Sequence, residues 1–185
     1  YDNAGNLIAI GGTAKEFVYN NANRMSVAKT AGTIVGTYVY NGMGEQVQRQ
    51  TATTTRFVYD EAGQLIGQYD NTGTAIQQYI AMDGMPVGMI VSPSQAPTAN
   101  QRLKYVQSDQ LGTPRAIIDP TRQLAIWRWD ENSEGFGNTA PNTDPDVDGT
   151  NVVFDLRFPG QRYDQASGLY YNYFRDFDPA TGRYT

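Results

Sequence analysis

A short phrase recurs along this chain about every twenty residues, and a fixed period of this length is the mark of a repeat architecture. Each copy begins with a tyrosine and reaches a Gly or Asn four or five residues later. The copies start at Tyr1, Tyr19, Tyr40, Tyr59 and Tyr79, so the steps between them are 18, 21, 19 and 20 residues. A shorter echo of the phrase starts at Tyr69, halfway through one period. One repeat is therefore long enough for two short strands and two turns.

The residue types within the phrase predict a turn. An Asp or Asn at its start caps the backbone through its side chain, and the later Gly or Asn tolerates a positive φ. The residues before the phrase alternate in character, as Phe57 and Tyr59 do, which is the period of a strand with one buried face. Intermediate turns are expected at residues 11–13, 30–32, 52–54 and 70–73. The repeat predicts consecutive antiparallel β-hairpins, with each tyrosine stacked on its copy in the next hairpin.

Composition supports an all-β chain and excludes several functions. The chain has 19 Gly and 13 Tyr, which are common in strands and turns, and it lacks long stretches typical of helices. The net charge is −5 and the 14 Lys and Arg are scattered, which argues against a nucleic-acid partner. With no His and no Cys, hydrolysis by a His-assisted Ser or Cys and zinc sites made of these residues are excluded. No apolar run reaches the roughly 18 residues of a membrane helix.

The residue composition changes after Val91, and the tyrosine period ends there. Residues 92–101 are rich in Ser, Pro and other small polar residues, and they are predicted to be a loop. Strands follow at 116–118 and 124–129, with turns at 109–112 and at Asp119-Pro120. A polar stretch at 139–151 precedes a C-terminal part with many aromatic residues.

Three longer motifs carry a resemblance to a known family. They are SDQLGTPR at 108–115, RFPGQRYDQASGLYYN at 157–172 and FRDFDPATGRY at 174–184. Together with the tyrosine phrases, they make the chain resemble the YD-repeat family, and its last eighty residues resemble the Rhs repeat-associated core domain. On this basis residues 1–91 are assigned to YD repeats, 92–101 to the loop and 102–185 to the core domain. The core domain is expected to be truncated here, with its cleavage motif further along the polypeptide.

The resemblance implies a function for the longer polypeptide. In proteins of this kind, YD repeats wind into a hollow β-shell that encloses a C-terminal effector, often a toxin. The core domain closes one end of the shell and cuts the chain downstream, after an Asp-Pro-x-Gly-Leu type of sequence. Such proteins serve in bacterial competition and in insecticidal toxin complexes, so the resemblance implies a secreted or cell-surface protein delivered by a secretion system. The implied partner is the effector of the same chain.

The resemblance also implies site residues. The family's self-cleavage is of the aspartyl type, which needs two carboxyl groups in different protonation states. The matching Asp is Asp178, with Arg175 to orient it or to stabilise the developing oxyanion and Arg183 after the turn. The second Asp is expected in the downstream cleavage motif, so no activity is expected from residues 1–185 alone. Asp176 lies where many members carry an aromatic residue. From residue types alone, Asp178 to Gly182 is read as a turn, and the catalytic reading of Asp178 comes from the resemblance.

An acidic stretch suggests a metal site. Asp144, Asp146 and Asp148 alternate before Gly149, and Asp155 lies eleven residues after Asp144, which is close to the spacing of a calcium loop. No flanking helices are expected, and a solvated acidic loop explains the same residues. No other cofactor is predicted, because no glycine-rich turn joins a strand to a helix.

A second class of function stays open from the sequence. Aromatic-rich repeats also occur in extracellular modules that bind carbohydrate or a protein partner. Trp127 and Trp129 are expected on one face of a strand, where they would either pack in the core or stack on a bound sugar. Both chain ends are expected to lie within a longer polypeptide, and a β-spiral with open strand edges is expected to self-associate.

Overall fold

The computed structural model describes residues 1–92, 102–130 and 135–185, and the regular structure in these ranges is a set of strands in two antiparallel sheets. Twelve strands form one sheet strictly in chain order: β1 (Ala9–Ile10), β2 (Lys15–Tyr19), β3 (Met25–Thr30), β4 (Thr33–Tyr40), β5 (Gln46–Gln50), β6 (Thr54–Tyr59), β7 (Leu65–Tyr69), β8 (Ala75–Met82), β9 (Met85–Val91), β10 (Leu103–Ser108), β11 (Pro114–Asp119) and β12 (Leu124–Arg128). The other four are β13 (Arg162–Asp164), β14 (Leu169–Asn172), β15 (Arg175–Asp178) and β16 (Arg183–Tyr184). The predicted all-β class and the succession of hairpins are confirmed.

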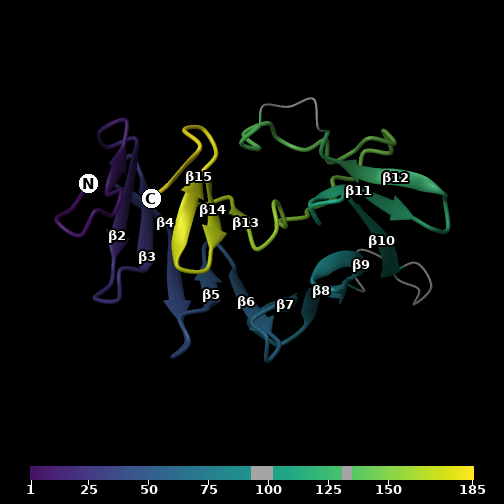
Figure 1. Ribbon diagram of the computed structural model, residues 1–185, viewed down its shortest axis with the longest axis horizontal. Coiled ribbons are helices and arrows are strands. Elements are labelled where there is room, and N and C mark those ends of the chain that lie inside the picture. The colour runs from purple at the N-terminus through teal and green to yellow at the C-terminus, as the bar shows by residue number, and fades with distance from the viewer. Residues whose placement is uncertain (93–101, 131–134) are drawn as a thin grey trace.

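The large sheet follows an arc, and the small sheet lies inside its opening (Figure 1). We call the large sheet the wall and β13–β16 the C-terminal sheet. The wall runs on from β9 to β10 and so continues beyond the predicted end of the repeats at residue 91. The predicted loop at 92–101 lies, apart from Ser92, outside the described residues. Among the described residues, no helical segment has the length and apolarity needed to span a bilayer.

The recurring phrase forms a five-residue turn closed by its own first side chain. At Asp60, Oδ1 accepts hydrogen bonds from the main-chain N–H groups of Ala62 (2.9 Å) and Gln64 (2.8 Å). Gly63 adopts a φ of 78°, which only Gly reaches without strain, and its N–H donates to the Asp60 carbonyl at 3.1 Å. The same side-chain bonds recur at Asp2, Asn20, Asn41, Asp70 and Asp109. These local bonds explain the period, because each turn is specified by five consecutive residues.

The tyrosine that opens the phrase bonds to the backbone of the preceding repeat. The hydroxyls of Tyr19, Tyr40 and Tyr59 donate to the main-chain carbonyls of Leu7 (3.0 Å), Met25 (2.8 Å) and Gln46 (3.0 Å). The expected stacking of each tyrosine on its copy is wrong for these three, since the contact between repeats is a hydrogen bond. In each case the strand register also shifts just before the tyrosine. Such bulges increase the local bend and twist of a sheet, which fits the curvature of the wall.

Two apolar cores lie along the arc. One, around Phe17, Met25, Ala28 and Tyr38, includes Leu169 of the C-terminal sheet. The other lies around Met89, Ile117, Trp127 and Trp129, and it includes Phe154 from the segment that leads to β13. Residues 152–158 and the C-terminal sheet therefore fill the concave side of the wall.

The two faces of the C-terminal sheet carry different side chains. One face carries a row of rings, Tyr163, Tyr170, Phe177 and Tyr184, whose successive centroids are 5.7, 6.2 and 5.3 Å apart. Arg157 lies against this row, 5.2 Å from the centre of the Tyr163 ring. The strand register places the opposite set of side chains on the other face: Arg162, Asp164, Leu169, Tyr171, Asp176, Asp178 and Arg183. This second face is polar, and most of it is buried against the wall.

Candidate active site on the C-terminal sheet

Asp178 lies at the end of β15 and caps the turn that follows. Its Oδ1 accepts a hydrogen bond from the Ala180 N–H at 3.0 Å, and its Oδ2 accepts one from the Thr181 hydroxyl at 2.8 Å. The Gly182 N–H donates to its main-chain carbonyl at 2.9 Å. The turn read from residue types is therefore present. Asp178 also lines a pocket of about 400 Å³ between the C-terminal sheet and the start of the wall.

The two arginines singled out with Asp178 occupy different places. Arg183 pairs with Asp178 across β15 and β16, shares its face and lines the same pocket. Arg175 points to the opposite face, where its guanidinium carbon lies 4.6 Å from the centre of the Tyr184 ring. The structure thus brings Asp178 and Arg183 together and places the Arg175 guanidinium against an aromatic ring. The catalytic roles assigned to all three remain predictions.

Asp176 is buried in this region, with 8% of its surface exposed. It shares a face with Asp178, and its main-chain carbonyl accepts hydrogen bonds from the N–H (2.8 Å) and hydroxyl (3.1 Å) of Thr185. Among the described residues, no hydrogen bond or ion pair to its carboxyl group is found. Burial, together with the negative charge of Asp164, raises the pKa of Asp176 to about 7, although Arg162 and Arg24 oppose the shift. Asp176 therefore holds a proton in slightly acidic to neutral solution.

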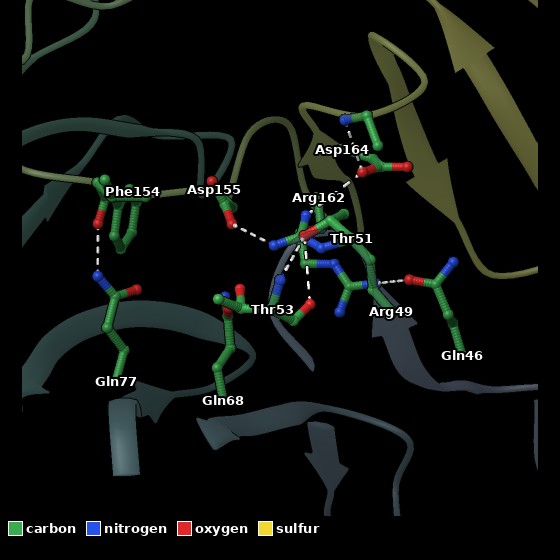
Figure 2. A network of polar contacts seen from close by, with 12 residues as sticks. Gln46, Arg49, Thr51, Thr53, Gln68, Gln77, Phe154, Asp155, Arg162 and Asp164 are labelled. Atoms are coloured by element: carbon green, nitrogen blue, oxygen red, sulfur yellow. Dashed lines mark hydrogen bonds and ion pairs between the residues drawn. The ribbon is translucent and has the colours of Figure 1, made fainter. Parts of the chain in front are cut away.

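A polar network joins the C-terminal sheet to the wall (Figure 2). Arg49 of β5 lies between two acids, with Nη1 3.3 Å from Asp164 Oδ1 and Nη2 4.0 Å from Asp155 Oδ2. The Tyr38 hydroxyl donates to Asp164, and Arg162 donates to the Gln46 side chain. Both arginines lie over apolar or aromatic surface, with the Arg162 guanidinium carbon 3.3 Å from the centre of a phenylalanine ring. Because these groups are buried and bonded in pairs, the network fixes how the C-terminal sheet sits on the wall.

The acidic stretch predicted as a calcium loop brings three of its four acids together. Asp144, Asp146 and Asp148 can place oxygens within 4.8 Å of one another, whereas Asp155 lies in the network with Arg49. Arg122 lies against the cluster, with Nη1 2.7 Å from Asp146 and 2.6 Å from Asp148. An arginine therefore already balances part of the negative charge that would attract a cation. Calcium binding stays a prediction, which a calcium titration of thermal stability would test.

Other residues noted in the sequence are part of the packing. Trp127 and Trp129 are 0% and 1% exposed, so packing rather than carbohydrate stacking explains them. Asp109 forms the predicted turn, and its Oδ2 accepts a hydrogen bond from Arg115 at 3.0 Å. These positions therefore belong to the framework of the wall.

Sequence reasoning missed the acids and bases that meet across the two sheets. Tyr38 and Asp164 are 126 residues apart, and Arg162 and Gln46 are 116 apart. A local signal was nevertheless present, because Arg162 and Asp164, and likewise Asp176 and Asp178, alternate within short strands of otherwise aromatic residues. Charged residues at strand positions flanked by aromatic ones indicate a face buried against polar partners.

Comparisons with known proteins give a consistent picture. No family model matches the chain. It is 33% identical over 109 residues, 59% of this chain, to the toxin protein Tse5 of Pseudomonas aeruginosa, and 29% identical over 178 residues, 91% of this chain, to the probable deoxyribonuclease RhsB of Dickeya dadantii. The matched regions make up 7% and 11% of those proteins.

A solved structure shares the fold. The Photorhabdus luminescens Tc holotoxin pore matches with a TM-score of 0.68 and 18% identity, over 100% of this chain and 9% of that one. At this identity the likeness concerns the fold alone. The same arrangement of wall and C-terminal sheet thus occurs within a much larger toxin assembly.

Proposed function

Because this chain belongs to the Rhs family of YD-repeat proteins, we propose that it forms part of the wall of a hollow β-shell enclosing an effector carried by the same polypeptide. The observation that carries the proposal is the wall itself, in which twelve strands follow one another in chain order along an arc. A sheet of this kind can be extended by further hairpins at either end, because each hairpin contacts only its neighbours. The relative named as a toxin, Tse5, supports a toxic effector as the cargo, and the proposal extends to secretion and delivery.

Enclosure has a direct test in the whole polypeptide with its C-terminal effector. A protease is added to the intact protein and, as a matched control, to the effector expressed alone. We expect the enclosed effector to survive protease concentrations that digest the isolated effector. Equal digestion of the effector in both samples would refute enclosure.

We also propose that the longer polypeptide cuts itself through Asp178. A carboxylate that lines a pocket beside β16, close to the end of the residues described, is suitably placed to act on a peptide bond further along the chain. The test is cell-free synthesis of the whole polypeptide, sampled over time on a gel, with Asp178→Asn beside the unmutated chain. Appearance of two fragments only from the unmutated chain supports the proposal, and identical patterns from both remove Asp178 from the mechanism.

Self-association of residues 1–185 is a further part of the proposal. The outer edges of β1 and β12 end the wall, and unpaired strand edges favour pairing with another chain. Light scattering coupled to size exclusion should show a mass that rises with protein concentration. A constant monomer mass over a hundredfold range of concentration would contradict this.

A further inference from the structure

A pocket lies between one edge of the wall and the segment that leads into the C-terminal sheet, and we call it the rim pocket. It measures about 450 Å³, within the range of roughly 300–1,000 Å³ that is usual for ligand pockets. One side is lined by turn residues of three successive hairpins, Gly63, Gly84 and Gly112. Residues 156–162 line the other side, and the end of β14 with the turn after it completes the lining.

The lining of the rim pocket is mainly apolar. It includes Leu65, Pro86, Pro114, Leu156, Phe158 and Pro159. The two leucines and the phenylalanine also pack against the core around Met89 and Trp127, so the floor of the pocket continues that core. Surfaces of prolines, aromatic rings and leucines of this kind suit the apolar side chains of an extended peptide.

Two polar side chains that line the rim pocket are buried with some of their atoms unpaired. Gln161 is 8% exposed and Arg162 is 3% exposed. Among the described residues, Gln161 Oε1 has no donor, and Nε and Nη1 of Arg162 have no acceptor. Buried polar groups without partners reduce stability, and a ligand that pairs with them removes this cost. The missing partners are a donor and acceptors, which the N–H and C=O groups of a peptide backbone supply.

The side-chain amide of Gln161 is suited to a peptide group. It carries an acceptor oxygen and two N–H donors, so it complements a backbone N–H and a backbone carbonyl. Rotation about its last torsion is soft, which lets the amide turn toward a ligand in the pocket.

The chain that follows Thr185 is directed toward this pocket. β16 runs antiparallel to β15, and the Thr185 N–H continues their pairing by donating to the Asp176 carbonyl at 2.8 Å. A strand advances about 3.3 Å per residue, so about three further residues reach the level of the turn between β14 and β15. Tyr173 of that turn lines the pocket, and so does Asn172, whose Nδ2 donates to the Tyr184 hydroxyl at 2.7 Å. A segment that continues β16 therefore arrives beside the rim pocket.

We propose that the rim pocket docks an extended, apolar segment of the polypeptide downstream of Thr185. Gln161 pairs with the backbone of this segment, and the prolines and aromatic rings hold its side chains. The docking rests on the proposed function, because this segment joins the wall to the enclosed effector. It adds a fixed position for the joining segment against the wall. Since the segment is covalently attached, it reaches the pocket at a high effective concentration, ahead of any separate chain.

Site-specific photo-cross-linking of the whole polypeptide with its effector tests the docking. p-Benzoylphenylalanine replaces Ala81, an exposed residue that lines the pocket, and in a matched control it replaces Asn71, an exposed turn residue that does not. After illumination, mass spectrometry of the digested protein identifies the attached peptide. Position 81 should attach to residues beyond Thr185 with a yield roughly tenfold above that of position 71, because the tethered segment is held at the pocket. A mixture of heavy-isotope and light-isotope protein shows whether both peptides come from one molecule.

Gln161→Leu separates docking from folding. The change removes a buried amide that lacks a partner, so the melting temperature of the whole polypeptide should stay the same or rise. Cross-linking from position 81 to the downstream segment should nevertheless fall by roughly fivefold, the effect of losing about one hydrogen bond. Gln165→Leu, at an exposed position that does not line the pocket, is the matched control and should leave the yield unchanged.

Several results would overturn the docking. Cross-links from position 81 that join a heavy molecule to a light one would identify a second copy of the chain as the occupant. Absence of any attachment beyond Thr185 would leave the pocket without this occupant, and an unchanged yield for Gln161→Leu would remove the amide from the recognition.

The protease experiment on enclosure is read separately. If the effector is protected but position 81 attaches to nothing beyond Thr185, enclosure stands and the docking is refuted. If the effector is digested as fast as the isolated effector, the proposed enclosure fails, and cross-links from position 81 within one molecule would still establish the docking.

Discussion

Replacing Asp176 by Asn should stabilise the protein, and the gain should grow with pH. The folded state raises the pKa of this carboxyl group from 3.8 to about 7, chiefly through burial and then through Asp164. Below about pH 4 the group is protonated in both folded and unfolded chains, so ionisation has no influence. Between about pH 4 and 7 the unfolded chain ionises first, which favours unfolding, and above pH 7 the penalty reaches its plateau. Asn has nearly the same shape and never ionises.

The size of the effect follows from the pKa change. A rise from 3.8 to about 7, at about 1.4 kcal/mol for each pH unit, corresponds to about 4 kcal/mol as an upper limit. The side chain is buried, so solvent screening reduces this value little. Relaxation of the surroundings and the new amide group take up part of it. We therefore expect about 2–4 kcal/mol of added stability at pH 8 and a small change at pH 4.5.

Urea unfolding of residues 1–185 between pH 4.5 and 8.5 measures this difference directly. Asp109→Asn serves as a matched control of opposite sign, because main-chain hydrogen bonds from Thr113 and Leu111 lower the pKa of Asp109 despite partial burial. It should be less stable than the unmutated chain at pH 8. If Asp176→Asn is equally or less stable at pH 8, or if its effect is the same at every pH, the assignment of a protonated buried acid is wrong.

Three further changes test the wall and its network. Arg49→Ala leaves two buried acids, Asp164 among them, without their cation and should cost about 3–5 kcal/mol in urea unfolding, while a neutral effect would show that the network adds no stability. Tyr40→Phe removes the hydroxyl that binds the preceding repeat and should cost about 1 kcal/mol by the same assay, and no loss would mean that water replaces this bond. The pKa of Asp119 is lowered to about 2, because hydrogen bonds, chiefly from its lysine partner, outweigh the opposing effect of burial. The ionised Asp119 therefore stabilises the fold above pH 4, and roughly 2 kcal/mol of this stability is lost as the pH falls through 2. Asp119→Asn should flatten that part of the acid unfolding curve.

The surroundings of Asp176 differ from those of another acid on the same sheet face. A charge that is buried without a partner reduces stability. The neighbouring Asp164 shows the contrast, because it is also buried but is bonded to Arg49 and Tyr38. Two acids on one sheet face thus differ in their side-chain partners.

The sequence by itself determined the repeating wall. Each turn depends on five consecutive residues, whose first side chain and glycine make all the bonds that the turn needs, as at Asp60 and Gly63. The strands between turns follow from alternation over a few residues. Local hydrogen bonds and backbone preferences can be read without knowledge of distant residues, which is why the all-β class and the hairpin order were predictable.

Only the tertiary structure decided what the C-terminal residues do. The acid at 155 joins Arg49 instead of the loop with Asp144, and Asp176 becomes buried between sheets, because strands more than a hundred residues apart meet inside the arc. Burial and the fields of distant charges set which acids are paired and which are protonated. These are properties of the packed chain, and no spacing along the sequence contains them.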